Sequence, residues 1–487
     1  MSQRIVVIGA GMSGLLCGMK LRAAGYDDVR IYEKAQRAGG TWRDNRYPGL
    51  SCDVPSQHYC YSFALNPEWT SAYPSRAEIH AYLEDTAARF GALELVQFGK
   101  ELARAEWVDG CWRLAFTDGS ADAADTLIAA TGVLHHPVLP AIEGVGAFAG
   151  PAFHTAGWPD GIDLAGQRVG IIGTGSTAIQ MMPAVVDEVR EIKLFQRSPQ
   201  WILPIEDTPF TEAEKAEFRA RPELLEAAYD GWNARIRKGI ARAVVGDEER
   251  LQKIADACRE HLETKVRDPE MRARLTPDYK VACKRLVMSE HFYDAIQRPN
   301  AELVTNGIEC IESQGIRTTD GVLHELDVLV YATGFDATAY MRPIELIGPG
   351  GYSLEQAWSE ATIAHRGVTI PGFPNFFMML GPNSPIGNFS LIMVAEHQID
   401  YIQQLMRQAN GGAVAPKPEA CARFNAEVRA AMQNTVWVSG CTSWYLDKHG
   451  HPVVWPWSLE RFQDDMAAPD PGEFEWRQIT TGEEISS

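Results

Sequence analysis

Apolar and polar positions follow the same order in two separate stretches of the chain. The first stretch has an apolar strand pattern at 5–8, a glycine-rich turn, a helical pattern and a second strand pattern at 29–32. The second stretch repeats this order between strand patterns at 168–172 and 192–195. Strand–turn–helix–strand units of this length are typical of dinucleotide-binding folds. The pattern therefore predicts an α/β protein with two Rossmann-like dinucleotide-binding domains.

A region of different character interrupts the second unit. Thr211 and Glu214 have the spacing of a capping box, and a charged stretch with helical periodicity runs from there to about Arg274. After Gly334 we expect the chain to return to the first domain. The first domain is predicted to consist of residues 1–140 and 336–487. The second is predicted to consist of residues 141–208, which include a linker, and residues 281–335. Between these two parts, residues 209–280 form the predicted helical insertion.

Length and charge limit the class of protein. A chain of 487 residues is too long for one core, and its net charge of −19 argues against binding nucleic acid or anionic membranes. The N-terminus runs directly into a strand, and no apolar run reaches about 18 residues, the length that a membrane span requires. We therefore expect a cytoplasmic protein without nucleic-acid or membrane partners, and the oligomeric state stays open.

The nine Cys residues are scattered, with no C-x-x-C pair and no Cys and His spacing of a zinc site. The sequence thus predicts no metal site and favours a reducing compartment. A flavin-dependent disulfide reductase is also disfavoured, because it needs two closely spaced Cys near its flavin.

The first glycine turn, Gly9-Ala-Gly11-Met-Ser-Gly14, has the composition of a pyrophosphate site. Its glycines permit a tight turn, a close approach of the backbone to a pyrophosphate, and close packing of helix on strand. The helix behind the turn offers unpaired N–H groups to the phosphates. Glu33, at the end of the next strand, accepts hydrogen bonds from a ribose diol and repels a 2′-phosphate. The turn therefore predicts a site for FAD or NAD rather than NADP.

The second glycine turn, Gly173-Thr-Gly175-Ser176-Thr177-Ala178, has Ala in place of the third glycine. At the end of the next strand, where the first unit has Glu33, this unit has Arg197 and Ser198. Loss of the acid and gain of a guanidinium and a hydroxyl favours a 2′-phosphate, which an Arg binds through two parallel hydrogen bonds. We interpret this unit as an NADPH site, and a surface Arg is the alternative.

A third motif lies between the two turns: Phe148-Ala-Gly150-Pro-Ala-Phe-His154-Thr-Ala-Gly-Trp158-Pro159. Its pattern, F-x-G-x-x-x-H-x-x-x-W-P, resembles the fingerprint of type I Baeyer–Villiger monooxygenases, flavoenzymes that insert an oxygen atom beside a ketone carbonyl. The related flavin-containing N- and S-oxygenases have a similar motif, which usually lacks the Trp-Pro ending. The resemblance covers nearly the whole chain and implies that His154 and Trp158 couple the two domains.

A fourth motif follows the first glycine turn and resembles a second consensus of this family, G-x-W-x(4)-Y-P-G-x(3)-D. It is carried by Gly40, Thr41, Trp42, the run Tyr47-Pro48-Gly49, and Asp53. By resemblance, Thr41 and Trp42 lie along the flavin, and Asp53 reaches its isoalloxazine ring. Core packing is the alternative for Trp42, and an exposed loop carboxylate is the alternative for Asp53.

A Lys-Arg pair is the candidate for the oxidation chemistry. A peroxide that attacks a ketone must stay anionic, and Arg, protonated at any working pH, is a suitable partner for it. Lys284-Arg285 resembles the family element in which the Arg, oriented here by Asp53, stabilises the peroxyflavin and the Lys contacts the 2′-phosphate. Leu286 stands where many members have Pro, and a surface Lys-Arg pair is the alternative.

The C-terminal part carries further family elements. The run 380–384, which includes Asn383, resembles the loop over the flavin pyrimidine. Trp444-Tyr-Leu-Asp447 and Trp455-Pro-Trp457 resemble C-terminal elements that we expect at or near the substrate pocket.

Taken together, the resemblance implies that NADPH reduces FAD, that O2 forms a C4a-peroxyflavin, and that a ketone becomes an ester or lactone, with sulfoxidation as an expected second activity. A flavin-containing N- or S-oxygenase of amines or sulfides is the main alternative, which Trp158-Pro159 and Asp53 disfavour. A nucleotide-binding sensor or scaffold is a second alternative, which the intact glycine turns and Arg285 disfavour. The sequence does not identify the ketone or the selectivity of its oxidation.

Overall fold

Two parallel sheets form the frame of the molecule, which the computed structural model describes over residues 3–479. The first sheet has five strands in the order β19 (Phe376–Met378), β7 (Thr126–Ala129), β1 (Ile5–Ile8), β2 (Val29–Glu33) and β3 (Val96–Phe98), all parallel. Strands β1 and β7 are buried at every position, as expected for apolar runs in a sheet that is covered on both faces. Because β19 comes from late in the sequence, the chain returns to this sheet after building the second one.

The second sheet repeats the design with β13 (Ala301–Val304), β10 (Glu191–Phe195), β9 (Arg168–Ile172), β17 (Val328–Tyr331) and β8 (Ala152–His154), again all parallel. Helix α1 (Met12–Ala23) follows β1, and helix α4 (Ser176–Val185) follows β9. Both helices begin directly after a glycine of the predicted turns, Gly11 and Gly175. The predicted α/β fold with two Rossmann-like units is confirmed.

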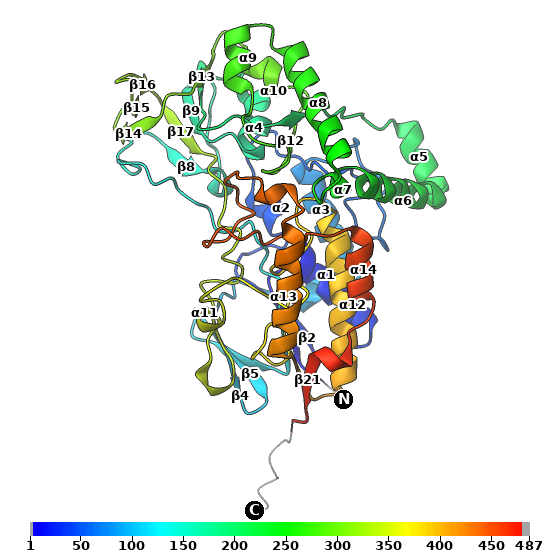
Figure 1. Cartoon of the computed structure of the whole chain (residues 1–487). Helices are drawn as coiled ribbons and strands as arrows, with labels where there is room; N and C mark the ends of the chain where they lie inside the picture. The colour runs from blue at the N-terminus through cyan, green and yellow to red at the C-terminus, as the bar shows by residue number, and fades with distance from the viewer. Residues whose placement is uncertain (1–2, 480–487) are drawn as a thin grey trace, which may run out of the picture.

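A set of helices separates the short strands β11 (Ile202–Leu203) and β12 (Val287–Met288). It consists of α5 (Glu212–Ala220), α6 (Pro222–Lys238), α7 (Ile240–Ala243), α8 (Glu248–Lys265) and α9 (Pro269–Leu275). The predicted capping box of Thr211 and Glu214 starts α5. These helices, green in Figure 1, bridge the two sheets, because α8 packs on α10 (Phe292–Ile296) while Arg237 of α6 pairs with Glu460 of α14 (Leu459–Ala467) at 3.4 Å.

Long helices and smaller sheets surround the two parallel sheets. Helix α12 (Leu391–Ala409) packs along α1 and against α14 (Figure 1). The other helices are α2 (Thr41–Asp44), α3 (Arg76–Arg89), α11 (Leu354–Ala357) and α13 (Pro418–Met432). The other strands are β4 (Leu102–Val108), β5 (Cys111–Phe116), β6 (Ala121–Ala124) and β18 (Glu345–Ile347) in one sheet, β14 (Ile308–Glu312), β15 (Gly315–Thr318) and β16 (Leu323–Glu325) in another, and β20 (Ala413–Pro416) with β21 (Phe474–Arg477).

A disulfide joins Cys283 to Cys441 across 158 residues of sequence, and the other seven Cys residues are free. The scattered Cys spacing did not predict this bond, because the two segments become neighbours only in the folded chain. The cysteines therefore no longer support the expectation of a reducing compartment. Between residues 3 and 479, no helix combines the length and the apolar character of a membrane span. In the same part of the chain, no three His, Cys, Asp or Glu side chains come together in a way that could hold a metal ion.

A cluster of charged side chains holds the C-terminal segment against the first sheet. Glu473, whose side chain is only 12% exposed, bonds the His365 ring at 3.1 Å, Arg366 at 3.0 Å and Arg423 at 2.8 Å. The hydrogen bond from His365 and the charge of Arg366 hold the pKa of Glu473 well below its ordinary value. The cluster thus needs the ionised carboxylate, since its loss takes the acceptor of the buried His365 ring and leaves Arg366 with Asp465.

We predict that Glu473→Gln lowers the melting temperature at pH 7, with a loss of about 2–3 kcal/mol of unfolding free energy, less than for a fully buried pair. Because the folded-state pKa is depressed, the stabilisation is present above the unfolded-state value of about 4.3 and is lost as the pH falls further. Thermal unfolding at several pH values measures the effect. Glu475→Gln, which removes a half-exposed carboxylate paired with Arg477 two residues away, is the control. Equal melting temperatures for Glu473→Gln and wild type at pH 7 would contradict the prediction.

Candidate active site

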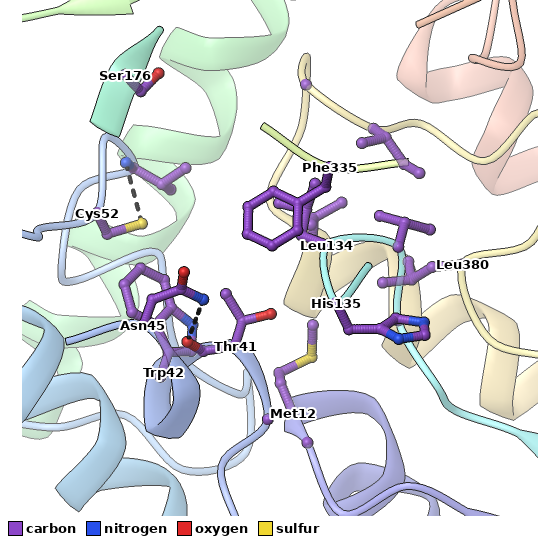
Figure 2. Close-up of a pocket in the computed structure, with 18 of the residues that line it drawn as sticks. Met12, Thr41, Trp42, Asn45, Cys52, Leu134, His135, Ser176, Phe335 and Leu380 are labelled. Atoms are coloured by element: carbon purple, nitrogen blue, oxygen red, sulfur yellow. Dashed lines mark hydrogen bonds between the residues drawn. The ribbon is translucent and has the colours of Figure 1, made fainter. Parts of the chain in front are cut away.

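One large cavity, of about 1490 Å³, lies between the two dinucleotide units. Pockets for a single drug-sized ligand have about 300–1,000 Å³, so this cavity has room for more than one small molecule. Figure 2 shows Met12 and Thr41 from the first unit on one side of this space and Ser176 and Phe335 on the other. The helical insertion contributes Trp232 and other residues of α6 to α8 to its wall, which the sequence did not indicate.

The first glycine turn is built for close approach of the backbone. Gly9 has φ +101°, and a Cβ atom there would lie 2.7 Å from the carbonyl oxygen of Ala130. A Cβ atom on Gly14 would overlap the carbonyl oxygen of Gly9, so this position serves the packing of helix on strand. Gly11 and Gly40 face each other, since a Cβ atom on Gly40 would lie 2.9 Å from the Cα atom of Gly11. The turn therefore presents bare backbone to the cavity that Gly9, Gly11 and Gly40 line.

Glu33 lines the cavity at the end of β2. Its carboxylate accepts hydrogen bonds from the backbone N–H groups of Ala10 at 2.8 Å and Ala35 at 2.9 Å. Arg43 lies 3.1 Å from the same carboxylate. These contacts fix the position of the carboxylate at the rim of the first glycine turn, and a carboxylate has lone pairs left for further donors.

Thr41 and Trp42 form the start of helix α2 beside the glycine turn. Trp42 is buried, and its indole N–H donates to the Tyr59 hydroxyl at 3.0 Å, yet the residue also borders the cavity. Trp42 therefore has both the core packing and the cavity position that the sequence left as alternatives. Thr41 is exposed toward the cavity in Figure 2.

Asp53 and Arg285, 232 residues apart in sequence, form an ion pair on the cavity wall. Nη2 of Arg285 donates to both carboxylate oxygens of Asp53, at 2.8 and 2.6 Å. The charge of Asp53 raises the pKa of Arg285 above its ordinary value, so the guanidinium is permanently protonated. The guanidinium borders the cavity, which Tyr445 also lines. Neither residue is a surface group, since the side chains are only 30% and 18% exposed.

The residues expected at a 2′-phosphate lie together outside this cavity. Nζ of Lys284 donates to Oγ of Ser198 at 2.8 Å, and Arg197 is exposed beside them. Burial, and after it the charge of Arg197, lowers the pKa of Lys284. The cavity itself is lined by three residues of the second glycine turn, Gly175, Ser176 and Thr177. Gly173 instead packs closely against the backbone of Ala332. Lys284 and Arg285 are adjacent in sequence, yet Lys284 lies with the residues expected at the 2′-phosphate and Arg285 lies on the cavity wall.

His154 and Trp158 lie behind the cavity wall rather than in it. Nδ1 of His154 accepts a hydrogen bond from the backbone of Ala156 at 3.1 Å, and its ring meets the cavity residue Phe335 edge to face at 5.5 Å. Burial lowers the pKa of His154, which favours the neutral ring. The carbonyl oxygen of Trp158 accepts a hydrogen bond from Arg46, which follows α2, at 3.1 Å. The fingerprint segment therefore contacts both dinucleotide units.

The structure does not bring Asn383 to the cavity. Its side chain is buried and donates to the amide oxygen of Asn425 at 3.2 Å. Asn388, just before α12, does line the cavity and is only 3% exposed, and its amide nitrogen and oxygen have no partner among residues 3–479. An unpartnered buried amide costs free energy, so this position points to a ligand with a donor and an acceptor. The sequence offered no signal that would distinguish Asn388 from Asn383.

The two C-terminal aromatic elements differ in whether they reach the cavity. Trp444 and Tyr445 line the cavity, as expected. Trp455 is fully buried and packs on Phe462 of α14 at 5.4 Å, and neither it nor Trp457 reaches the wall. The second element therefore does not line the cavity, because its aromatic rings complete the core around α13 and α14.

Known proteins resemble this chain over its whole length. The family model of an NAD(P)-binding Rossmann-like domain matches residues 7–73. A monooxygenase of Mycobacterium tuberculosis is 45% identical over 97% of this chain and 96% of its own. A Baeyer-Villiger monooxygenase of Streptomyces coelicolor is 38% identical over 97% of this chain and 92% of its own. The crystal structure of cyclohexanone monooxygenase from Rhodococcus sp. Phi1, bound to NADP+, superimposes with a TM-score of 0.87 at 30% identity and covers 98% of this chain and 99% of that one. This chain belongs to the Baeyer–Villiger monooxygenase family.

Proposed function

We propose that the protein is an FAD monooxygenase that uses NADPH and O2 to insert one oxygen atom next to a ketone carbonyl and so forms an ester or a lactone. The observation that carries the proposal is the Asp53–Arg285 pair on the wall of the cavity between the two glycine turns. Membership of the Baeyer–Villiger family supports the same reaction class.

FAD fits the first unit on three observations. Gly9, Gly11 and Gly40 leave backbone exposed where a pyrophosphate would lie, and Glu33 would bind a ribose diol. The unpartnered amide of Asn388 offers a donor and an acceptor to the pyrimidine edge of a flavin. When bound and reduced, the flavin supplies the activated oxygen. We assign Thr41 and Trp42 to the wall along its ring system.

NADPH fits the second unit, where Ser176 and Thr177 open helix α4 at the cavity. Arg197, Ser198 and Lys284 would bind the 2′-phosphate, since two cations and a hydroxyl gather there. His154 and Trp158 would couple this unit to the first one through Phe335 and Arg46.

Arg285 would act on the oxygen that attacks the ketone. This oxygen carries negative charge, and a cation fixed in place before the reaction stabilises such charge better than water does. Asp53 holds Nη2 of Arg285 and leaves its other N–H groups for the reacting oxygen. A heteroatom oxygenase needs no such cation, because its oxidant is uncharged. The pair therefore favours ketone oxidation, with sulfoxidation as a second activity of the same site.

We predict that Arg197→Ala raises KM for NADPH about 10- to 150-fold and leaves KM for NADH almost unchanged, because only NADPH has the 2′-phosphate that a guanidinium binds. Steady-state NADPH and NADH oxidation with a ketone measures both constants. Arg190→Ala removes an exposed Arg at the other end of β10 and is the control. Equal use of NADH and NADPH by the wild type would contradict the assignment of this unit.

We predict that Arg285→Ala still consumes NADPH and O2 but releases hydrogen peroxide, and that ketone oxidation falls at least about 100-fold, since a fixed partner of the attacking oxygen is lost. Arg285→Lys recovers only part of the ketone oxidation, because an ammonium lacks the planar array of N–H donors that a guanidinium offers beside Asp53. Peroxide and ester yields per NADPH measure the outcome. Wild-type ester yield in Arg285→Ala would move the catalytic group elsewhere.

A further inference from the structure

Tyr445 and Arg285 line the same cavity. Both hydrogen bonds to Asp53 come from Nη2 of Arg285. Burial raises the pKa of the Tyr445 hydroxyl, and the charge of Arg285 opposes this rise, as expected for neighbouring groups. A guanidinium has five N–H donors in one plane, so a contact at Nη2 alone leaves its tilt free, and a second neighbour would restrict it.

Tyr445 is itself held by its surroundings. The residue is only 3% exposed, and its ring meets Trp444 at 4.4 Å and Trp437 at 5.9 Å between centroids. Its carbonyl oxygen accepts from the backbone N–H of Val453 at 2.8 Å. The hydroxyl lies directly over Gly387, where any side chain would collide with it. The glycine at 387 therefore admits the hydroxyl to its place beside Arg285.

The disulfide joins the same two segments a second time. Cys283 stands two residues before Arg285, and Cys441 stands four residues before Tyr445, with their Cα atoms 6.1 Å apart. Cys283 is fully buried, whereas residues 439–443 form an irregular loop. The sulfur bridge thus adds a covalent attachment next to Arg285 to the contacts that hold Tyr445. Neither Cys belongs to a motif for FAD or NADPH.

We propose that residues 437–445 are a tethered positioning element for the oxidation site, in which Tyr445 positions Arg285 and the Cys283–Cys441 disulfide holds the element in place. The role of Arg285 in this proposal rests on the proposed function. Reduction by a dithiol breaks the S–S bond, and two electrons and two protons pass to the Cys pair while the dithiol becomes a disulfide. The reduced segment keeps the packing and the backbone hydrogen bond of Tyr445 but loses its covalent attachment, so the distance between Tyr445 and Arg285 is less tightly fixed.

Thiol counting and proteolysis test the tether without any flavin chemistry. In denaturant, the oxidised wild type is expected to show seven free thiols before reduction and nine after it, against seven in both states for Cys283→Ala/Cys441→Ala. Trypsin is expected to cut after the exposed Lys448 several times faster in the double variant than in the wild type. Cys111→Ser, which removes a free Cys in β5, is the control for both measurements. Nine thiols in the unreduced wild type, or equal cleavage rates, would overturn the tether.

Hydrogen peroxide released per NADPH tests the positioning. Tyr445→Phe keeps the ring and is expected to raise this ratio several-fold, with NADP+ affinity and melting temperature unchanged. The Cys double variant is expected to raise it in the same direction. If the disulfide acts through Tyr445, the combined triple variant is no worse than Tyr445→Phe, because effects on one shared contact do not add. A wild-type ratio in Tyr445→Phe, or full additivity, would overturn the proposal. A wild type that oxidises no ketone would instead refute the proposed function, while the thiol count and the cleavage rate still decide the tether.

Discussion

The site depends on one ion pair between two residues that lie far apart in the sequence. Asp53 lies in the first dinucleotide unit and Arg285 follows the helical insertion, yet Nη2 of Arg285 bonds both carboxylate oxygens. A cation in a partly buried wall is stable only beside such an acid, and it is useful only if its other donors stay free. The insertion that carries the chain from the second glycine turn to Arg285 therefore belongs to the site, although it contains no nucleotide motif.

The two glycine turns show how one design accepts different dinucleotides. Both place a glycine and a helix start at the cavity, but the end of the following strand differs. Glu33 is tied to two backbone N–H groups, which keep an acid there, whereas Lys284 and Ser198 gather with Arg197 at the second unit. In the proposed function, the charge at one strand end thus distinguishes the nucleotides of the two units, whose glycine turns line a common cavity.

Features that depend only on residues close together in the sequence could be predicted. The strands, the Thr211 capping box and the need for glycine at Gly9 and Gly14 follow from periodicity, caps and sterics over a few residues. Contacts between segments far apart in the sequence could not be predicted. Nothing in the sequence says that the Asn383 amide is consumed by Asn425, that Cys283 meets Cys441, or that the Trp455 ring is needed in the core, because each depends on which segments the finished fold brings together.

The reaction with labelled oxygen tests the account most directly. The purified protein, supplied with FAD, NADPH, a panel of cyclic and linear ketones and ¹⁸O2, should convert at least one ketone to an ester or lactone that carries a single ¹⁸O atom. That atom should lie in the ring or chain position next to the carbonyl, with the original ketone oxygen retained, as mass analysis of fragments can show. NADPH oxidation that yields only hydrogen peroxide across the panel, with no ester or lactone from any ketone, would contradict the account.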